Sequence, residues 1–335
     1  MLIVRPSKIS DLNAFIDLKD AAGSGFTSLA VHDSDLKARL QKSAKSFRSQ
    51  GDTSGNSIYL LMLEDSNTGE IVGVSAVKSQ VGVGKPFFSF KILNLVQSSS
   101  AADRHFNMEI MLLVNEYSGA SEVGTLFVKQ KMRGTGAGRL ISQARYMLIA
   151  AAPNLFADTV ISELRGRVDE QGYSPFWEGM GRKFFKMDFN EADEITAKTN
   201  NQFITDLMPR YPIYVDLLPD EARQVIGQCH PDGLGAKRLL EDEGFRYEKF
   251  VDIFDAGPTL EVRKNQIRTV KDSQLFKVRD GDQGKSRALM SNNRINDFRA
   301  VFTRATVEGD GVILTSEVRK ALRVKVNEQV RVFLS

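Results

Sequence analysis

Apolar residues in the first half of the chain follow two spacings, short continuous runs and stripes at helical intervals. Stripes with apolar residues three or four positions apart predict helices that bury one face, and short runs closed by turn residues predict strands. The stripes predict helices over 12–22 and 36–47, the second capped by Ser34 and Asp35. The runs predict strands at 2–4, 58–63, 71–77, 88–95, 110–114, 123–128 and 159–164. This order predicts a mixed α/β layer.

A glycine-rich loop follows the strand predicted at 123–128 and precedes a helical stripe over 140–151. It reads Arg133-Gly134-Thr135-Gly136-Ala137-Gly138. Glycines let the backbone approach a ligand closely, and the following helix adds the positive end of its dipole. The loop is therefore a candidate pyrophosphate site.

Spacing separates the nucleotide-binding motifs that this loop could represent. A P-loop would continue as Gly-Lys-Ser/Thr, but Arg139 and Leu140 follow Gly138. A dinucleotide fingerprint would need another glycine at position 139. The remaining pattern, Arg/Gln-x-x-Gly-x-Gly/Ala, resembles the coenzyme A loop of the GCN5-related N-acetyltransferase superfamily. The alternative is a glycine-rich turn that only ends a strand.

The second half predicts helices at 222–226 and 236–243, the latter ended by Gly244 and followed by a strand over 245–254. A looser helix-Gly-Phe-strand pattern over 174–189 indicates a weak internal duplication. Phe176, Trp177, Phe184 and Phe185 within it are expected in the core. Beyond Arg268 the chain is more polar, with a linker at 281–284 and short apolar runs at 312–314 and 330–334, which predicts a small β-rich appendage.

Composition narrows the class of protein. Hydrophobic residues make up 42% and charged residues 26%, as in globular proteins. The net charge of +3 does not favour nucleic-acid binding, and no apolar stretch predicts a membrane span or a signal peptide. A single cysteine, Cys229, fits the cytoplasm, and no metal-ligand spacing is visible.

Longer stretches resemble the arginine N-succinyltransferase family. They are GFTSL (25–29), SEVGTLFV (121–128), ELRGRVDEQGYSPFWEGMGRKFF (163–185), LMPRYPIY (207–214), VIGQCHP (225–231) and EDEGFRYEKFVDIFDAGPTLE (241–261). The resemblance implies transfer of succinyl from succinyl-CoA to the α-amino group of L-arginine, with no permanently bound cofactor. The chain would act alone, as a homo-oligomer, or with a paralogous subunit.

The resemblance also implies a fold class. We expect an α/β (α+β) protein with a GCN5-related N-acetyltransferase-like mixed sheet flanked by helices, in a tandem of two units. The expected domains are an acyltransferase domain with the coenzyme A loop at 1–188, a second, partial unit at 189–265 and a β-rich region at 266–335.

Candidate site residues come from the motifs. In the fold implied, the thioester lies against the strand before the loop, so backbone N–H groups from Leu126 to Val128 are candidates to stabilise an oxyanion. The resemblance implies a succinyl-CoA contact at Leu126 and a proton-donor role for His230, one of three histidines. The alternative for His230 is a surface or turn residue beside Pro231. The alternative for Cys229 is a small buried residue. Arg133, Gly134, Gly136 and Gly138 are expected to hold the coenzyme.

Substrate recognition is assigned to Glu163, Arg165, Asp169 and Glu170. Carboxylates can accept two hydrogen bonds from a guanidinium, and arginines can hold a succinyl or substrate carboxylate. The alternative is an ion-pair network that supports a strand end. Two other functions stay open: acylation of ornithine or another amine, and a non-catalytic CoA-sensing regulator.

Overall fold

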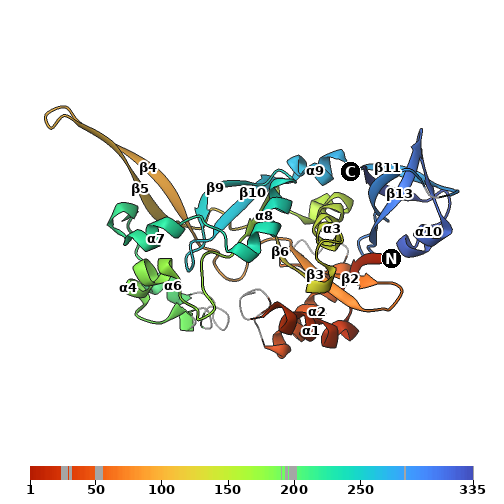
Figure 1. Ribbon diagram of the computed structural model, residues 1–335, viewed down its shortest axis with the longest axis horizontal. Coiled ribbons are helices and arrows are strands. Elements are labelled where there is room, and N and C mark those ends of the chain that lie inside the picture. The colour runs from red at the N-terminus through yellow and green to blue at the C-terminus, as the bar shows by residue number, and fades with distance from the viewer. Residues whose placement is uncertain are drawn as a thin grey trace. The chain divides into compact units, whose positions relative to one another are not determined.

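The computed structural model describes residues 1–23, 29, 32–49, 56–189, 191–192, 195, 202–282 and 284–334 (Figure 1). Residues 25–28 of the GFTSL motif and Gln283 of the expected linker lie outside them. Contacts divide the chain into two interleaved units: unit 1 is Met1–Gln80, Ser121–Val160 and Arg263–Ser335, and unit 2 is Val81–Ala120 and Ile161–Val262. The domain limits expected after residues 188 and 265 stay a prediction.

Unit 1 is a mixed α/β unit. Its helices are α1 (Leu12–Ala22), α2 (Asp33–Arg48), α3 (Ala137–Ala151), α9 (Arg268–Asp272) and α10 (Ser316–Leu322). Its strands are β1 (Leu2–Pro6), β2 (Ile58–Asp65), β3 (Ile71–Lys78), β6 (Ser121–Val128), β11 (Gln274–Asp280), β12 (Ser286–Ser291), β13 (Ala300–Glu308), β14 (Gly311–Leu314) and β15 (Gln329–Leu334).

Strands β1, β2, β3 and β6 are antiparallel neighbours with helices on both faces. Successive residues of β3 point to opposite faces of this sheet. Val74 and Ala76 join the apolar cluster of α1 and α2 on one face. On the other face, Ser75 Oγ donates to the carbonyl of Ile141 on α3 at 3.2 Å. Burial on both sides explains why these strands are continuous apolar runs. Helix α2 begins at Asp33, ahead of the cap expected at Ser34 and Asp35, and so places both aspartates in its first turn.

The end of the chain forms a small barrel. The strands follow the order β12, β15, β11, β14 and β13, and β12 also pairs with β13, which closes the sheet. Buried Val278, Met290 and Val332 lie in its apolar core with Leu322 of α10. Strand β1 joins this barrel to the rest of unit 1, since Val4 pairs with both Leu63 of β2 and Ala300 of β13.

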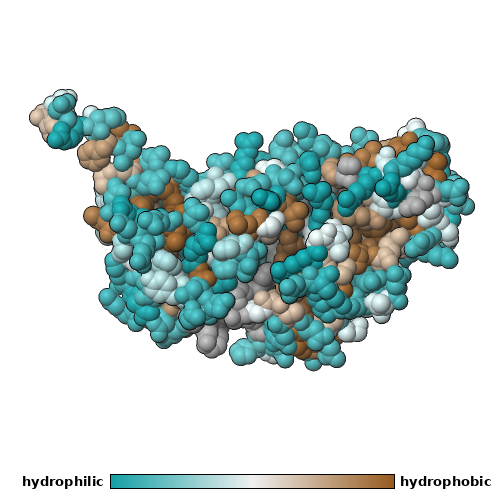
Figure 2. Space-filling model, viewed as in Figure 1, coloured by the Kyte–Doolittle hydropathy of each residue, from teal (hydrophilic) through white to brown (hydrophobic). Residues whose placement is uncertain are grey.

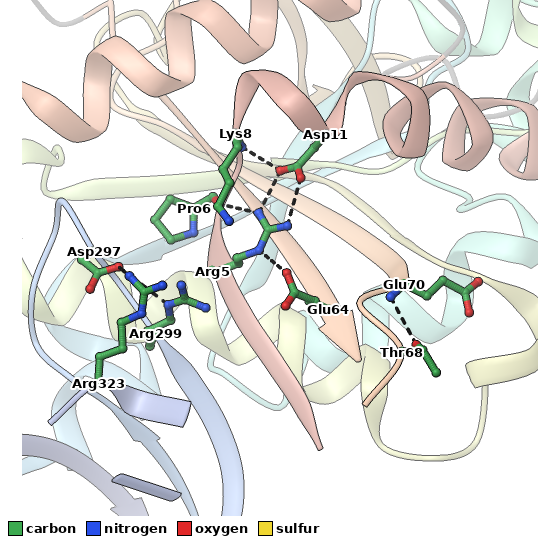
Figure 3. A network of polar contacts seen from close by, with 10 residues as sticks. All are labelled: Arg5, Pro6, Lys8, Asp11, Glu64, Thr68, Glu70, Asp297, Arg299 and Arg323. Carbon is green, nitrogen blue, oxygen red and sulfur yellow. Dashed lines mark hydrogen bonds and ion pairs between the residues drawn. The ribbon is translucent and has the colours of Figure 1, made fainter. Parts of the chain in front are cut away.

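Arg5 on β1 is buried beside this junction and is paired with carboxylates (Figure 3). Its guanidinium donates to both oxygens of Asp11 at 2.8 and 2.9 Å and also contacts Glu64. Burial opposes the charge, but the hydrogen bonds to the two carboxylates outweigh it and raise the pKa of Arg5.

Unit 2 is built around the antiparallel hairpin of β4 (Ser89–Ser99) and β5 (Arg104–Val114). The other strands are β7 (Thr159–Glu163), β8 (Ile213–Tyr214), β9 (Arg246–Val251) and β10 (Pro258–Arg263), in the order β7, β10, β9, β4, β5, β8. The helices are a π-helical turn (Trp177–Gly181), α4 (Arg182–Phe185), α6 (Gln202–Leu207), α7 (Asp220–Val225) and α8 (Leu234–Glu241).

The outer half of the β4–β5 hairpin extends beyond the rest of unit 2 (Figure 1). Val96 is 65% exposed and Phe106 49%. Figure 2 shows brown apolar surface between teal polar residues along this hairpin. No helix among the described residues has both the length and the apolar character to cross a membrane.

Two sequence predictions are wrong in unit 2. Phe176, Trp177 and Phe185 are buried as expected, but Phe184 is 37% exposed because α4 turns it away from the cluster around Trp177. The segment 174–189 is helical in most of its length and contains no strand among its described residues, so the helix-Gly-Phe-strand pattern forms only at α8, Gly244, Phe245 and β9.

Candidate active site

The glycine loop lies in unit 1 between β6 and α3, as its sequence position predicts. Gly134 and Gly136 have φ angles of 79° and 91°, a region that other residues rarely adopt. A Cβ at Gly134 or Gly138 would have no atom within 4 Å, so the loop leaves open space there. The loop and the first turn of α3 can therefore admit an anion close to the backbone.

Helix α3 is held firmly behind this loop. Its residues from Leu140 to Ile149 are all buried, and Gly136 accepts the N–H of Leu140 at 3.0 Å as the helix begins. Its 15 residues carry a dipole whose positive end lies at the loop. A phosphate at the loop would meet oriented N–H groups that need little rearrangement.

Strand β6 is irregular where the thioester contact is expected. Val74 pairs with Phe127 and Ala76 with Gly124, so Thr125 and Leu126 together face only Ser75. Thr125 has a φ of 51°, which accompanies this bulge. A bulge interrupts the ladder and turns backbone groups away from the neighbouring strand. Leu126 and Val128 are half-buried on either side of Phe127.

Basic side chains surround the loop. Lys129 and Lys131 contact Glu70 at 3.0 and 2.6 Å, and hydrogen bonds from Lys131 and then Lys129 lower the pKa of that half-buried carboxylate. Arg133 is exposed. Arg287 of β12 stacks over the ring of Phe302 at 4.8 Å, and its Nη2 lies 3.2 Å from the point where a Cβ of Gly136 would be. The barrel thus brings a further cation to the loop.

His230 lies in unit 2, between α7 and α8. Its Nδ1 accepts the backbone N–H of Asp232 at 3.2 Å, and 18% of its side chain is exposed. Burial, followed by the positive charge of Arg165, lowers the pKa of His230, which keeps the ring neutral at neutral pH. Its backbone N–H donates to the carbonyl of Arg165 at 2.8 Å, which joins it to the expected substrate segment.

The segment 163–170 is mixed in character. Arg165 and Arg167 are half-buried, and neither forms an ion pair among the described residues, so these two arginines do not build the ion-pair network that was the alternative to substrate recognition. Asp169 is exposed and closes a turn, accepting the N–H groups of Gln171 and Tyr173 at 2.9 and 2.8 Å. Glu163 ends β7 and is half-buried, whereas Glu170 is exposed.

Cys229 is buried, as expected for a structural residue. Burial raises the pKa of its thiol, so the thiolate is disfavoured. Its environment does not activate a nucleophile.

The structure groups the candidates into two sets. Leu126, Val128, Arg133, Gly134, Gly136 and Gly138 follow one another in unit 1, and Glu163, Arg165, Asp169, Glu170 and His230 belong to unit 2. Sequence reasoning missed Arg287 and a pair of acidic residues, Asp252 and Asp255, of which Asp255 accepts the N–H of Gly166 beside Arg165. The signal for that pair was the Asp-x-x-Asp-x-Gly spacing at 252–257.

Known proteins resemble the whole chain. Residues 2–269 match the family described as arginine N-succinyltransferase beta subunit, and residues 269–333 match the C-terminal domain of that subunit. Proteins named arginine N-succinyltransferase from Escherichia coli strains 55989 / EAEC and K12 / DH10B are each 38% identical over 334 residues, covering 99% of this chain and 97% of theirs. The structure of arginine/ornithine succinyltransferase subunit AI from Pseudomonas aeruginosa covers 100% of this chain and 98% of its own, with 33% identity and a TM-score of 0.90.

Proposed function

The chain belongs to the arginine N-succinyltransferase family, and on this premise we propose that it transfers a succinyl group from succinyl-CoA to the α-amino group of L-arginine. The products are N2-succinyl-L-arginine and CoA. The observation that carries this function is the match over nearly the full length of both this chain and its relatives. An acyltransferase of this kind needs no permanently bound cofactor, because the acyl-CoA is a co-substrate.

Coenzyme binding is assigned to the loop of unit 1. The backbone of Arg133, Gly134, Gly136 and Gly138 at the start of α3 holds the pyrophosphate. The bulge in β6 supports the placement of the thioester at Leu126, which lies in it and whose backbone N–H stabilises the oxyanion, while Val128, paired with Gly73 in the ladder, is a further coenzyme contact.

Proton transfer is assigned to His230. Its lowered pKa means that the ring must gain a proton before it can donate one. As the C–N bond forms, the attacking amine loses a proton to the ring, and the ring passes it to the CoA thiolate as the C–S bond breaks. Arg165 and Arg167 hold a carboxylate of substrate or succinyl, while Glu163, Asp169 or Glu170 accepts the guanidinium.

Ornithine is a second acceptor, because the relative from Pseudomonas is described as acting on arginine and ornithine. That relative is also described as a subunit, which supports assembly of this chain with a second copy or a paralogous chain. For the fold, we propose a tandem of acyltransferase-like units at 1–188 and 189–265 and a β-rich appendage at 266–335. The second family match, which begins at residue 269, supports the last limit.

The test is release of free thiol from succinyl-CoA, with arginine, ornithine or no acceptor, together with mass spectrometry of the product. Arginine is expected to give thiol and a succinylated product at the α-amine. No thiol release with either amino acid would refute the proposed activity. CoA binding without turnover would favour the regulatory alternative.

A further inference from the structure

One peptide unit in unit 2, between Arg165 and Gly166, is held from both sides. Its N–H donates to Asp255 Oδ2 at 2.8 Å, and its carbonyl oxygen accepts the backbone N–H of His230 at 2.8 Å. The carboxyl group of Asp255 therefore fixes the peptide that fixes the backbone of His230. Asp255 is 7% exposed, so water does not compete freely for these bonds.

The segments around this peptide lie backbone against backbone. A Cβ at Gly166 would be 2.2 Å from the carbonyl oxygen of Asp255, and one at Gly257 would be 2.1 Å from that of Leu164. The N–H of Gly227, three residues before His230, donates to the carbonyl of Ala256 at 2.9 Å. With no side chains between them to absorb a shift, movement of the loop at 252–257 moves the other two segments.

Asp255 has a carboxyl partner in the same loop. Its Oδ1 accepts the N–H of Gly257 at 2.8 Å, and Oδ1 of Asp252 accepts those of Phe254 and Asp255 at 2.7 and 3.0 Å. The negative charge of Asp252 also acts on the carboxyl group of Asp255. Two buried carboxyl groups this close cannot both be ionised at low cost, so the pair keeps one proton near neutral pH.

We propose that Asp255 is the positioning residue for His230, and that a second negative charge on the Asp252–Asp255 pair drives the two carboxylates apart, which shifts the loop at 252–257 and, with it, the Arg165–Gly166 peptide and His230. The expected loss of turnover rests on the proposed function, in which His230 carries a proton. The expected displacement of the His230 ring does not depend on that function.

The charges that face Asp255 support this titration. Burial, followed by the negative charge of Asp252, raises the pKa of Asp255 to about 8, while the backbone N–H groups of Gly257 and Gly166, followed by Arg165, act in the opposite direction. Cys229 also faces it, with a thiol whose own pKa is raised. Because a raised carboxyl pKa favours the protonated folded state, the stability from this pair is largest in acid and is lost as pH rises toward about 8.

The experiment compares the wild type with Asp252→Asn and Asp255→Asn between pH 6 and pH 10. Turnover of the wild type is expected to fall above about pH 8. In Asp252→Asn an amide donates to Asp255 without titrating, so the alkaline fall should be absent at about pH 9, where the wild type has lost about 90% of its turnover. Asp255→Asn should lower kcat by about 10-fold or more, since a misplaced proton donor affects the transition state, and leave the KM for succinyl-CoA within about 2-fold.

A second readout is independent of activity. The protein has three histidines, so the ring signal of His230 can be assigned in an NMR spectrum by its loss in His230→Ala. Asp255→Asn should shift this signal and the pH at which it titrates.

The matched control is Asp11→Asn, which removes a buried carboxylate of unit 1. It should lower the melting temperature but leave the fall of turnover above about pH 8 and the His230 signal unchanged.

The outcomes separate the two proposals. A wild type that releases no thiol refutes the proposed function, and the NMR comparison still tests the positioning role of Asp255. In an active enzyme, an unchanged His230 signal in Asp255→Asn, or a fall in turnover above about pH 8 in Asp252→Asn like that of the wild type, overturns this role. If Asp255→Asn does not fold, Asp252→Asn decides, because its amide oxygen keeps the bonds from Phe254 and Asp255.

Discussion

Replacement of Gly136 by glutamate tests the coenzyme loop directly. The residue has a φ of 91°, so a side chain there costs about 1 to 3 kcal/mol of folding free energy. The Cβ of the new side chain would lie 3.2 Å from Nη2 of Arg287, and its carboxylate adds a negative charge where the phosphates are expected. Loss of one charge-assisted hydrogen bond, roughly 1.5 to 3 kcal/mol, would weaken succinyl-CoA binding by about 10-fold to about 150-fold.

The assay is calorimetric titration with CoA, combined with thermal unfolding followed by circular dichroism. Gly309→Glu is the matched control, because Gly309 also has a positive φ, 59°, and open space at its Cβ position, but lies in the turn between β13 and β14. Gly309→Glu should lose a similar amount of folding free energy and keep the wild-type affinity for CoA. A folded Gly136→Glu protein with unchanged affinity for CoA would show that the phosphates bind elsewhere.

Further predictions concern the other site residues. His230→Ala should lower kcat by about a hundred-fold to ten-thousand-fold in steady-state assays with little change in succinyl-CoA affinity, and near-normal turnover would remove His230 from the mechanism. Arg287→Ala should weaken CoA binding in titrations by about 3-fold to 10-fold, as expected for an exposed cation. Arg304→Ala, which removes the cross-strand neighbour of Arg287, should leave CoA binding unchanged. Equal losses of affinity in the two variants would mean that Arg287 acts only through the overall positive charge of the surface. Among Glu163→Gln, Asp169→Asn and Glu170→Gln, at least one should reduce the arginine-to-ornithine ratio of kcat/KM by about 10-fold or more, since a guanidinium donates two parallel hydrogen bonds to a carboxylate and the ammonium of ornithine cannot. Three unchanged ratios would make these carboxylates structural.

Sequence reasoning reached the glycine loop because its determinants are local. A strand, two glycines with positive φ and an amphipathic helix follow one another between residues 121 and 151. Burial of both faces of β2 and β3 likewise left continuous apolar runs. The sequence predicts an element where residues close together in the chain determine its conformation.

Neither the contact between Asp255 and Gly166 nor the closure of the barrel could be found in this way. Asp255 and Gly166 are 89 residues apart, and neither has a neighbour in sequence that indicates their contact. In β11 only Val278 is fully buried, so QLFKVRD does not read as a strand without its barrel partners. Phe184 was misplaced because sequence shows an aromatic residue but not the direction in which a short helix turns it.

The double pairing of β1 has a consequence for synthesis on the ribosome. Its partner β2 ends at Asp65, but its other partner, β13, begins only at Ala300. At roughly 5 to 20 residues per second, the chain between Val4 and Ala300 takes about 15 to 60 seconds to appear. During that time one edge of β1 has no partner from this barrel, and an open edge can pair with another nascent chain. A folding chaperone that covers β1 until translation ends would therefore raise the yield of folded protein, although the folded protein itself is not made more stable.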